Sequence, residues 1–133
     1  MVKVPIWSAA LGVGNHTIDE QHRRILEHCR KLVDHCASGS GLTAQLHATL
    51  NDFTESLLQH FQSEEQTLAR NGCPHLAQHK AEHDALCERL TDLLFQATRG
   101  ELNPQDWVQV ALHWSNHHLH DFDLHARAYL HEQ

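Results

Sequence analysis

Histidine is the residue type that stands out in this sequence, because it accounts for 15 of the 133 residues. Imidazole is the commonest metal-binding side chain, and residues four apart on a helix point to the same side. His79 and His83 have this spacing, and His60 and Glu64 pair an imidazole with a carboxylate in the same way. The two pairs predict helices that carry metal ligands on one face.

These polar side chains interrupt apolar faces. Phe53 and Leu57 precede His60 at helical spacing, and His22 and His118 likewise fall on apolar stripes near the two ends of the chain. A buried imidazole or carboxylate without a partner costs a few kcal/mol, and several of them would unfold a small domain. A shared metal cluster would satisfy them together.

The elements that must position these residues read as four amphipathic helices with short connections. Thr17-x-x-Glu20 is a capping box, Asn71-Gly72 is a helix stop, and Asn103-Pro104 is a helix start. The sequence therefore predicts an all-α, antiparallel up-down four-helix bundle, a single domain over 1–133, with an irregular N-terminal arm. The expected ranges are 1–16 for the arm and about 17–38, 43–70, 75–98 and 104–130 for the helices.

The overall composition excludes several classes of protein. The formal charge is −7 and no Lys/Arg cluster is present, which argues against a nucleic-acid partner. No apolar run approaches the length of a membrane span, and the first residues do not form a signal peptide. The four cysteines include no C-x-x-C pair. We expect a cytoplasmic monomer with reduced thiols and no membrane insertion.

The donor set indicates which metal would bind. Imidazoles and carboxylates without thiolates suit iron, among other metals. Carboxylates can also bridge two ions, whereas imidazoles cannot. The ferritin-like arrangement is rich in glutamate, but this chain has one His/Glu pair and one His/His pair. That balance favours a binding centre over a carboxylate-rich oxidase.

In order along the chain, the motifs resemble those of the hemerythrin family over essentially the whole sequence. Trp7 and Gly12-x-Gly14 also match the N-terminal arm of that family. The motifs are Ile18-Asp19-Glu20-Gln21-His22, His60-x-x-x-Glu64-Glu65, His79-x-x-x-His83 and Trp114-x-x-x-His118-Leu119-x-x-x-Asp123.

The resemblance implies a non-haem di-iron centre that binds O₂ reversibly. Two Fe²⁺/Fe³⁺ ions would share a solvent-derived oxo or hydroxo bridge, and O₂ would bind to the iron that has fewer protein ligands. The implied ligands are His79, His83 and His118 on one iron, His22 and His60 on the other, and Glu64 and Asp123 bridging both.

The resemblance also implies an apolar O₂ pocket. A dry pocket disfavours the escape of charged reduced oxygen species. The family commonly has Leu where this chain has Ser115, and a smaller, polar residue there would admit water and speed autoxidation. The pocket residues are Ile25, Phe61, Trp114, Ser115 and Leu119.

Three residues near the ligands are harder to place. Asp123 lies five residues after His118, about 140° round a regular α-helix, so a π-bulge would be needed to turn it inward. Asp121, three residues after His118, is the competing candidate. Glu65 is expected on a solvated face, and His75 is an ambiguous candidate for orienting a ligand.

Oxygen transport, storage or delivery is the function that these features favour, with no catalytic residues and no enzymatic role beyond a minor redox activity. An oxygen-using enzyme or a redox protein would then be the partner. The alternatives are oxygen or redox sensing through a partner, and a di-iron oxidase or peroxidase. A structural zinc site would not need seven ligands.

Overall fold

The computed structural model describes residues 3–39 and 41–132, apart from the side chain of His120. Helices and loops make up this part of the chain, without strands. The long elements are α1 (His16–Ser38), α2 (Ala44–Arg70), α3 (Leu76–Thr98) and α4 (Pro104–His113), which continues into the π-helical segment η2 (Trp114–Asp123). The short elements are η1 (Ala9–Leu11) and α5 (Arg127–Leu130).

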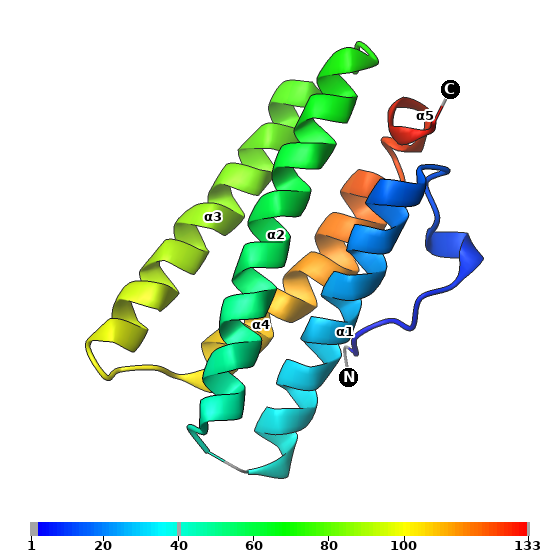
Figure 1. Cartoon of the computed structure of the whole chain (residues 1–133). Coiled ribbons are helices and arrows are strands. Elements are labelled where there is room, and N and C mark those ends of the chain that lie inside the picture. The colour runs from blue at the N-terminus through cyan, green and yellow to red at the C-terminus, as the bar shows by residue number, and fades with distance from the viewer. Residues whose placement is uncertain (1–2, 40, 133) are drawn as a thin grey trace.

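The long helices run alternately up and down, and each packs against two neighbours (Figure 1). Helix α1 lies between α2 and α4, and α3 contacts the same two helices from the opposite side of the bundle. This arrangement confirms the predicted antiparallel four-helix bundle. No helix in the described residues is long and apolar enough to cross a membrane.

Side-chain caps fix where α1 and α2 begin. Thr43 accepts from the backbone N–H of Leu46 at 3.1 Å, as a good N-cap residue does. The capping box predicted at Thr17 is wrong, because Asn15 caps α1 and accepts from the N–H of Ile18. The Asn15 amide also donates to the carbonyl of Leu130 at 3.0 Å. This second bond ties the start of α1 to the C-terminal turn.

The N-terminal arm is held against the bundle by hydrogen bonds between its backbone and side chains of α1. Arg30 donates to the carbonyl of Pro5, and Asp19 accepts from the backbone N–H of Val13 at 2.9 Å. Figure 1 shows the arm running alongside α1. The first two residues of the predicted 1–16 arm lie outside the described part of the chain.

Two apolar clusters form the core, one on each side of a polar layer. Along α1, Ile18 belongs to one cluster and Ile25 to the other, with His22 between them. Along α2, Phe61 and Leu68 are divided in the same way by Glu64. The layer therefore crosses the bundle at one level.

The last predicted helix, 104–130, is not one regular α-helix. Its hydrogen bonding changes from the α to the π pattern at Trp114, and η2 ends at Asp123. At this junction the hydroxyl of Ser115 donates to the carbonyl of Ala111 at 2.8 Å, and the amide of Asn116 donates to that of Leu112 at 3.1 Å. These extra donors satisfy carbonyls where the backbone pattern changes.

Candidate metal centre

The polar layer contains all seven residues that the sequence suggested as ligands. Their side chains come from four elements and converge in the middle of the bundle, where each is at most 3% exposed. Helix α1 provides His22, α2 provides His60 and Glu64, α3 provides His79 and His83, and η2 provides His118 and Asp123.

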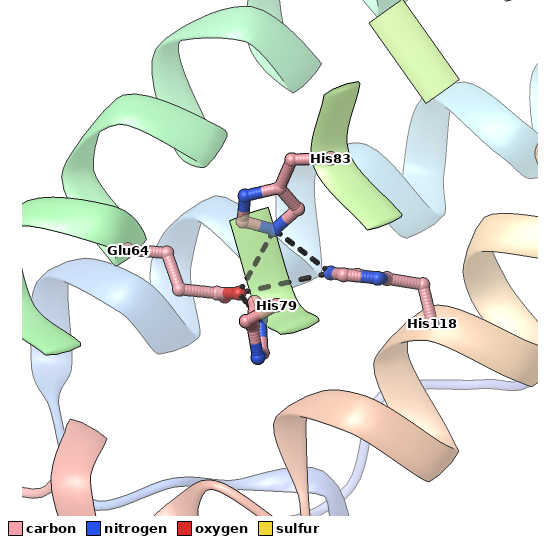
Figure 2. Close-up of side chains that lie close together, drawn as sticks. All are labelled: Glu64, His79, His83 and His118. Carbon is pink, nitrogen blue, oxygen red and sulfur yellow. Dashed lines mark hydrogen bonds and ion pairs between the residues drawn. The ribbon is translucent and has the colours of Figure 1, made fainter. Parts of the chain in front are cut away.

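Three histidines and Glu64 form one group of donors (Figure 2). The Nε2 atoms of His83 and His118 are 3.0 Å apart. Oε1 of Glu64 lies 3.2 Å from Nε2 of His83 and in contact with Nε2 of His79. Four donors from three elements therefore surround one point.

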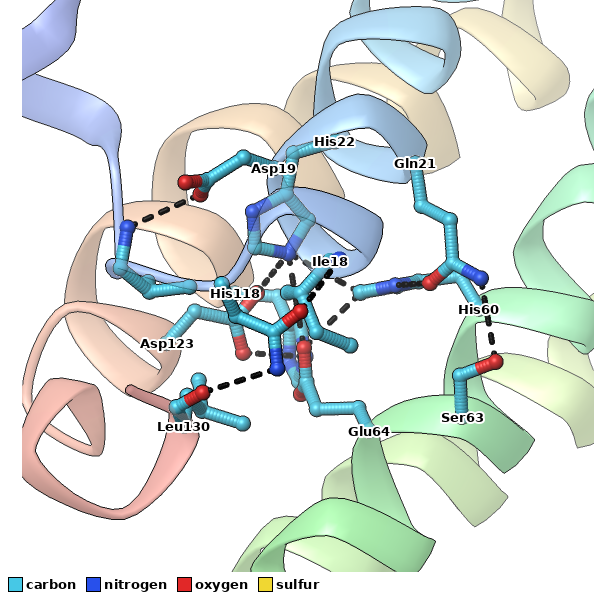
Figure 3. Close-up of polar contacts among 12 residues, drawn as sticks. Ile18, Asp19, Gln21, His22, His60, Ser63, Glu64, His118, Asp123 and Leu130 are labelled. Carbon is cyan, nitrogen blue, oxygen red and sulfur yellow. Dashed lines mark hydrogen bonds and ion pairs between the residues drawn. The ribbon is translucent and has the colours of Figure 1, made fainter. Parts of the chain in front are cut away.

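The second group contains two histidines and both carboxylates (Figure 3). The Nε2 atoms of His22 and His60 are 3.0 Å apart. Oε2 of Glu64 lies 2.9 Å from Nε2 of His60, and Oδ2 of Asp123 lies 3.1 Å from Nε2 of His22. This group has one imidazole fewer than the first.

Each carboxylate extends from one group to the other. Glu64 directs Oε1 toward the three histidines and Oε2 toward the other two. Asp123 also extends between the groups, because Oδ1 lies 2.9 Å from His79 and 3.2 Å from His118 in the first group while Oδ2 faces His22 in the second. Two carboxylates placed in this way are arranged to bridge two cations.

The π-helical segment explains why Asp123 takes part. Hydrogen bonds between residues five apart bring such residues onto one face, which a regular α-helix does not do. Asp123 consequently lies beside His118 and is fully buried. The competing candidate, Asp121, is instead 53% exposed and contacts His117.

The protonation of His60 and His83 suits metal binding. Nδ1 of His60 faces the Gln21 carbonyl oxygen at 2.9 Å, and Nδ1 of His83 faces a Glu65 oxygen at 2.8 Å. Both acceptors require the proton on Nδ1, which leaves a lone pair on each Nε2. These lone pairs point into the cluster.

Unsatisfied oxygens lead to the same conclusion. Among the described residues, Oε2 of Glu64 and both oxygens of Asp123 are buried without a properly aligned hydrogen-bond donor. Buried carboxylate oxygens of this kind are costly unless a cation satisfies them. The chemistry of the residues therefore fits a two-metal cluster with nitrogen and oxygen ligands.

The carboxylates also control protonation of the histidines. Burial lowers the pKa of His22 and of His79, but Asp123 and Glu64 outweigh it and raise each to about 9. The same balance raises the pKa of His118 to about 10. Although burial raises the pKa of Glu64, the surrounding histidines hold it well below its usual range. Metal ions would take the place of these protons.

Two residues that orient ligand histidines, Glu65 and Gln21, do not follow from the sequence analysis. Glu65 was expected on a solvated face, and this is wrong because its carboxylate accepts from His83 on the adjacent helix. Gln21 accepts from His60 and donates to the hydroxyl of Ser63 at 3.0 Å, which fixes its amide orientation. In the sequence, only their positions beside Glu64 and His22 could have indicated this role. His75 is exposed and lines a cavity beside His79.

The predicted pocket residues are all buried, and two of them pack against the ligand rings. Phe61 stacks on His83 with ring centroids 4.2 Å apart, and the Trp114 ring lies 5.8 Å from His22 and 6.2 Å from His60. The remaining three are Ile25, Ser115 and Leu119. Trp114 thus covers the two-histidine side of the cluster.

Comparison with known proteins gives a family match over most of the chain. The hemerythrin HHE cation-binding domain matches residues 13–126. A bacteriohemerythrin of Methylococcus capsulatus is 32% identical over 120 residues, covering 88% of this chain and 89% of its own length. One from Stenotrophomonas maltophilia is 27% identical over 118 residues, with 89% and 76% coverage.

Solved structures agree with the sequence matches. The crystal structure of wild-type hemerythrin superimposes with a TM-score of 0.84 at 28% identity, covering 98% of this chain and all of its own. Two variants of hemerythrin give the same TM-score. The superposition covers nearly the whole chain, and the family model covers most of it, so the chain belongs to the hemerythrin family.

Proposed function

We propose that this protein binds O₂ reversibly at a non-haem di-iron centre and serves in oxygen transport, storage or delivery. The observation that carries the proposal is the placement of Glu64 and Asp123, each with one oxygen toward the three-histidine group and the other toward the two-histidine group. When bound, a pair of irons supplies the redox chemistry that makes O₂ binding reversible.

Each ligand has a place in this proposal. His79, His83 and His118 would hold one iron, His22 and His60 would hold the other, and Glu64 and Asp123 would bridge them. An iron held by His22 and His60 would have one protein ligand fewer, which would leave a position open for a small molecule, as in other reactive metal sites. A solvent-derived oxo or hydroxo bridge would complete the pair.

The surrounding side chains would keep water away from that open position. Trp114, Phe61, Ile25 and Leu119 belong to the buried apolar cluster on one side of the polar layer. Gln21 and Glu65 hold the proton of a ligand histidine on the outer nitrogen, which fixes the ring for metal binding. The chain thus supplies a preorganised site with a mostly apolar lining.

Hemerythrins are oxygen-binding proteins rather than enzymes, and the family assignment does not favour an oxidase, a peroxidase or a sensor. We restrict any enzymatic role to a minor redox activity. All four cysteines are free, which supports a reducing compartment such as the cytoplasm. The proposed partner is an oxygen-using enzyme or a redox protein, with the chain acting as a monomer.

Oxygen uptake by the reduced, iron-loaded protein tests this function. Two irons and one O₂ per chain are expected. His60→Ala should remove O₂ uptake and leave the helical circular dichroism largely intact, because it takes one of only two histidines from the O₂-binding iron. Normal uptake by this variant would show the ligand assignment to be wrong.

A further inference from the structure

A second group of metal-binding side chains lies on the surface, between α3 and the junction of α4 with η2. It contains Glu82, His113 and His117, and one ligand atom from each lies within 4.8 Å of the others. Nε2 of His113 is 2.7 Å from Oε1 of Glu82. His113 and His117 are four residues apart, with ring centroids separated by 4.7 Å.

A neighbouring carboxylate orients one of these imidazoles. Nδ1 of His117 lies 3.0 Å from Oδ2 of Asp121. Asp121 therefore accepts the Nδ1 proton and leaves the lone pair on Nε2. A carboxylate that holds a histidine in this way is the usual support of a metal ligand, because it fixes the tautomer and raises the basicity of the ring.

The exposure of the group suits an open coordination site. The side chains of His113 and His117 are 44% and 46% exposed, whereas Glu82 is 17% exposed. Solvent can therefore complete the coordination of a bound ion. An exposed His–Glu pair alone contributes little stability, so the convergence of a third donor is not explained by an ion pair.

We propose that Glu82, His113 and His117 form a second metal site, which takes a divalent transition-metal ion such as Zn²⁺. Two imidazoles, one carboxylate and solvent are a common four-coordinate set for this ion. The site is separate from the polar layer, although Oε1 of Glu82 also lies 3.9 Å from Nδ1 of His118. Variants of the two histidines are therefore the cleaner test.

The test is calorimetric titration of the oxidised, iron-loaded protein with ZnCl₂, with iron measured before and after. We expect one equivalent of Zn²⁺ to bind without release of iron. His113→Ala and His117→Ala should each weaken Zn²⁺ binding by at least about tenfold. Loss of a residue that only orients a ligand already costs about that much, and these variants remove a ligand itself. Asp121→Ala, which removes the acceptor for His117, should weaken Zn²⁺ binding by roughly tenfold.

His47→Ala is the matched control, because it removes an exposed histidine from α2, and it should bind Zn²⁺ like the wild type. Circular dichroism and iron content confirm that each variant is folded. The proposal is overturned if the wild type binds no zinc beyond what displaces iron. It is also overturned if both His113→Ala and His117→Ala bind as the wild type does.

Discussion

At the scale of single residues, hydrogen bonds on the outer nitrogens decide how the ligand histidines face. His60 and His83 are each held by one acceptor, Gln21 and Glu65 respectively. His22 differs, because its Nδ1 is buried without a hydrogen-bond partner among the described residues. The ligands are therefore not equally well oriented, and His83 should depend strongly on Glu65.

Replacing Glu65 by Ala should weaken iron binding by about 10- to 100-fold, the effect typical of losing an orienting partner. Competition with a chelator measures this affinity. Glu65→Gln keeps an acceptor oxygen and should lose less, while Glu55→Ala, exposed on the same helix, should have no effect. Unchanged iron affinity in Glu65→Ala would contradict this role.

Ser115 has a different role at this scale. Its hydroxyl donates to the carbonyl of Ala111, so its hydrogen-bonding capacity is already used within the helix. Compared with the leucine common in the family, the main difference is therefore a smaller side-chain volume in the pocket. Ser115→Leu should therefore slow autoxidation by excluding water, as followed by the decay of the oxygenated spectrum. Ser115→Ala removes the hydroxyl without adding volume and should not slow it. An unchanged rate in Ser115→Leu would refute the wetter pocket.

At the scale of elements, the π-helical segment decides which aspartate reaches the centre. Asp123→Ala should lower the iron content from two per chain to at most one, because it removes an oxygen donor from both groups. Asp121→Ala should keep both irons. Iron analysis of the purified proteins distinguishes the two, and loss of iron from Asp121→Ala alone would reverse the assignment.

The same element shows how far sequence reasoning extends. The pairs His60/Glu64 and His79/His83 follow from helical periodicity, since each pair lies on one face of one helix. Choosing between Asp121 and Asp123 requires the local hydrogen-bonding pattern, which periodicity alone leaves open. The contact between Glu65 and His83 depends on how α2 and α3 pack, and residue spacing within one helix does not contain that information.

At the scale of the whole molecule, a layer of buried histidines and carboxylates divides the apolar core. Because the carboxylates favour protonated histidines, metal uptake is linked to the release of protons. His22, His79 and His118 have pKa values of about 9, 9 and 10. They are therefore protonated in the metal-free protein at neutral pH and must lose those protons to bind iron.

Loading the metal-free protein with Fe²⁺ at pH 7 should release about three protons per chain, one from each of these histidines. Since fewer sites are protonated as the pH rises through 9, the number released should fall there, and apparent iron affinity should increase with pH. Titration in weakly buffered solution measures the release. No release at pH 7 would show that these histidines are already neutral.

The most direct test of the central claim is the visible spectrum during one cycle of oxygenation. The iron-loaded protein is reduced without air, exposed to O₂, and then freed of O₂ again. Reversible binding predicts an absorption band that appears with O₂ and disappears when O₂ is removed, over repeated cycles. A spectrum that passes directly to the ferric form and stays there would contradict the assignment as an oxygen carrier.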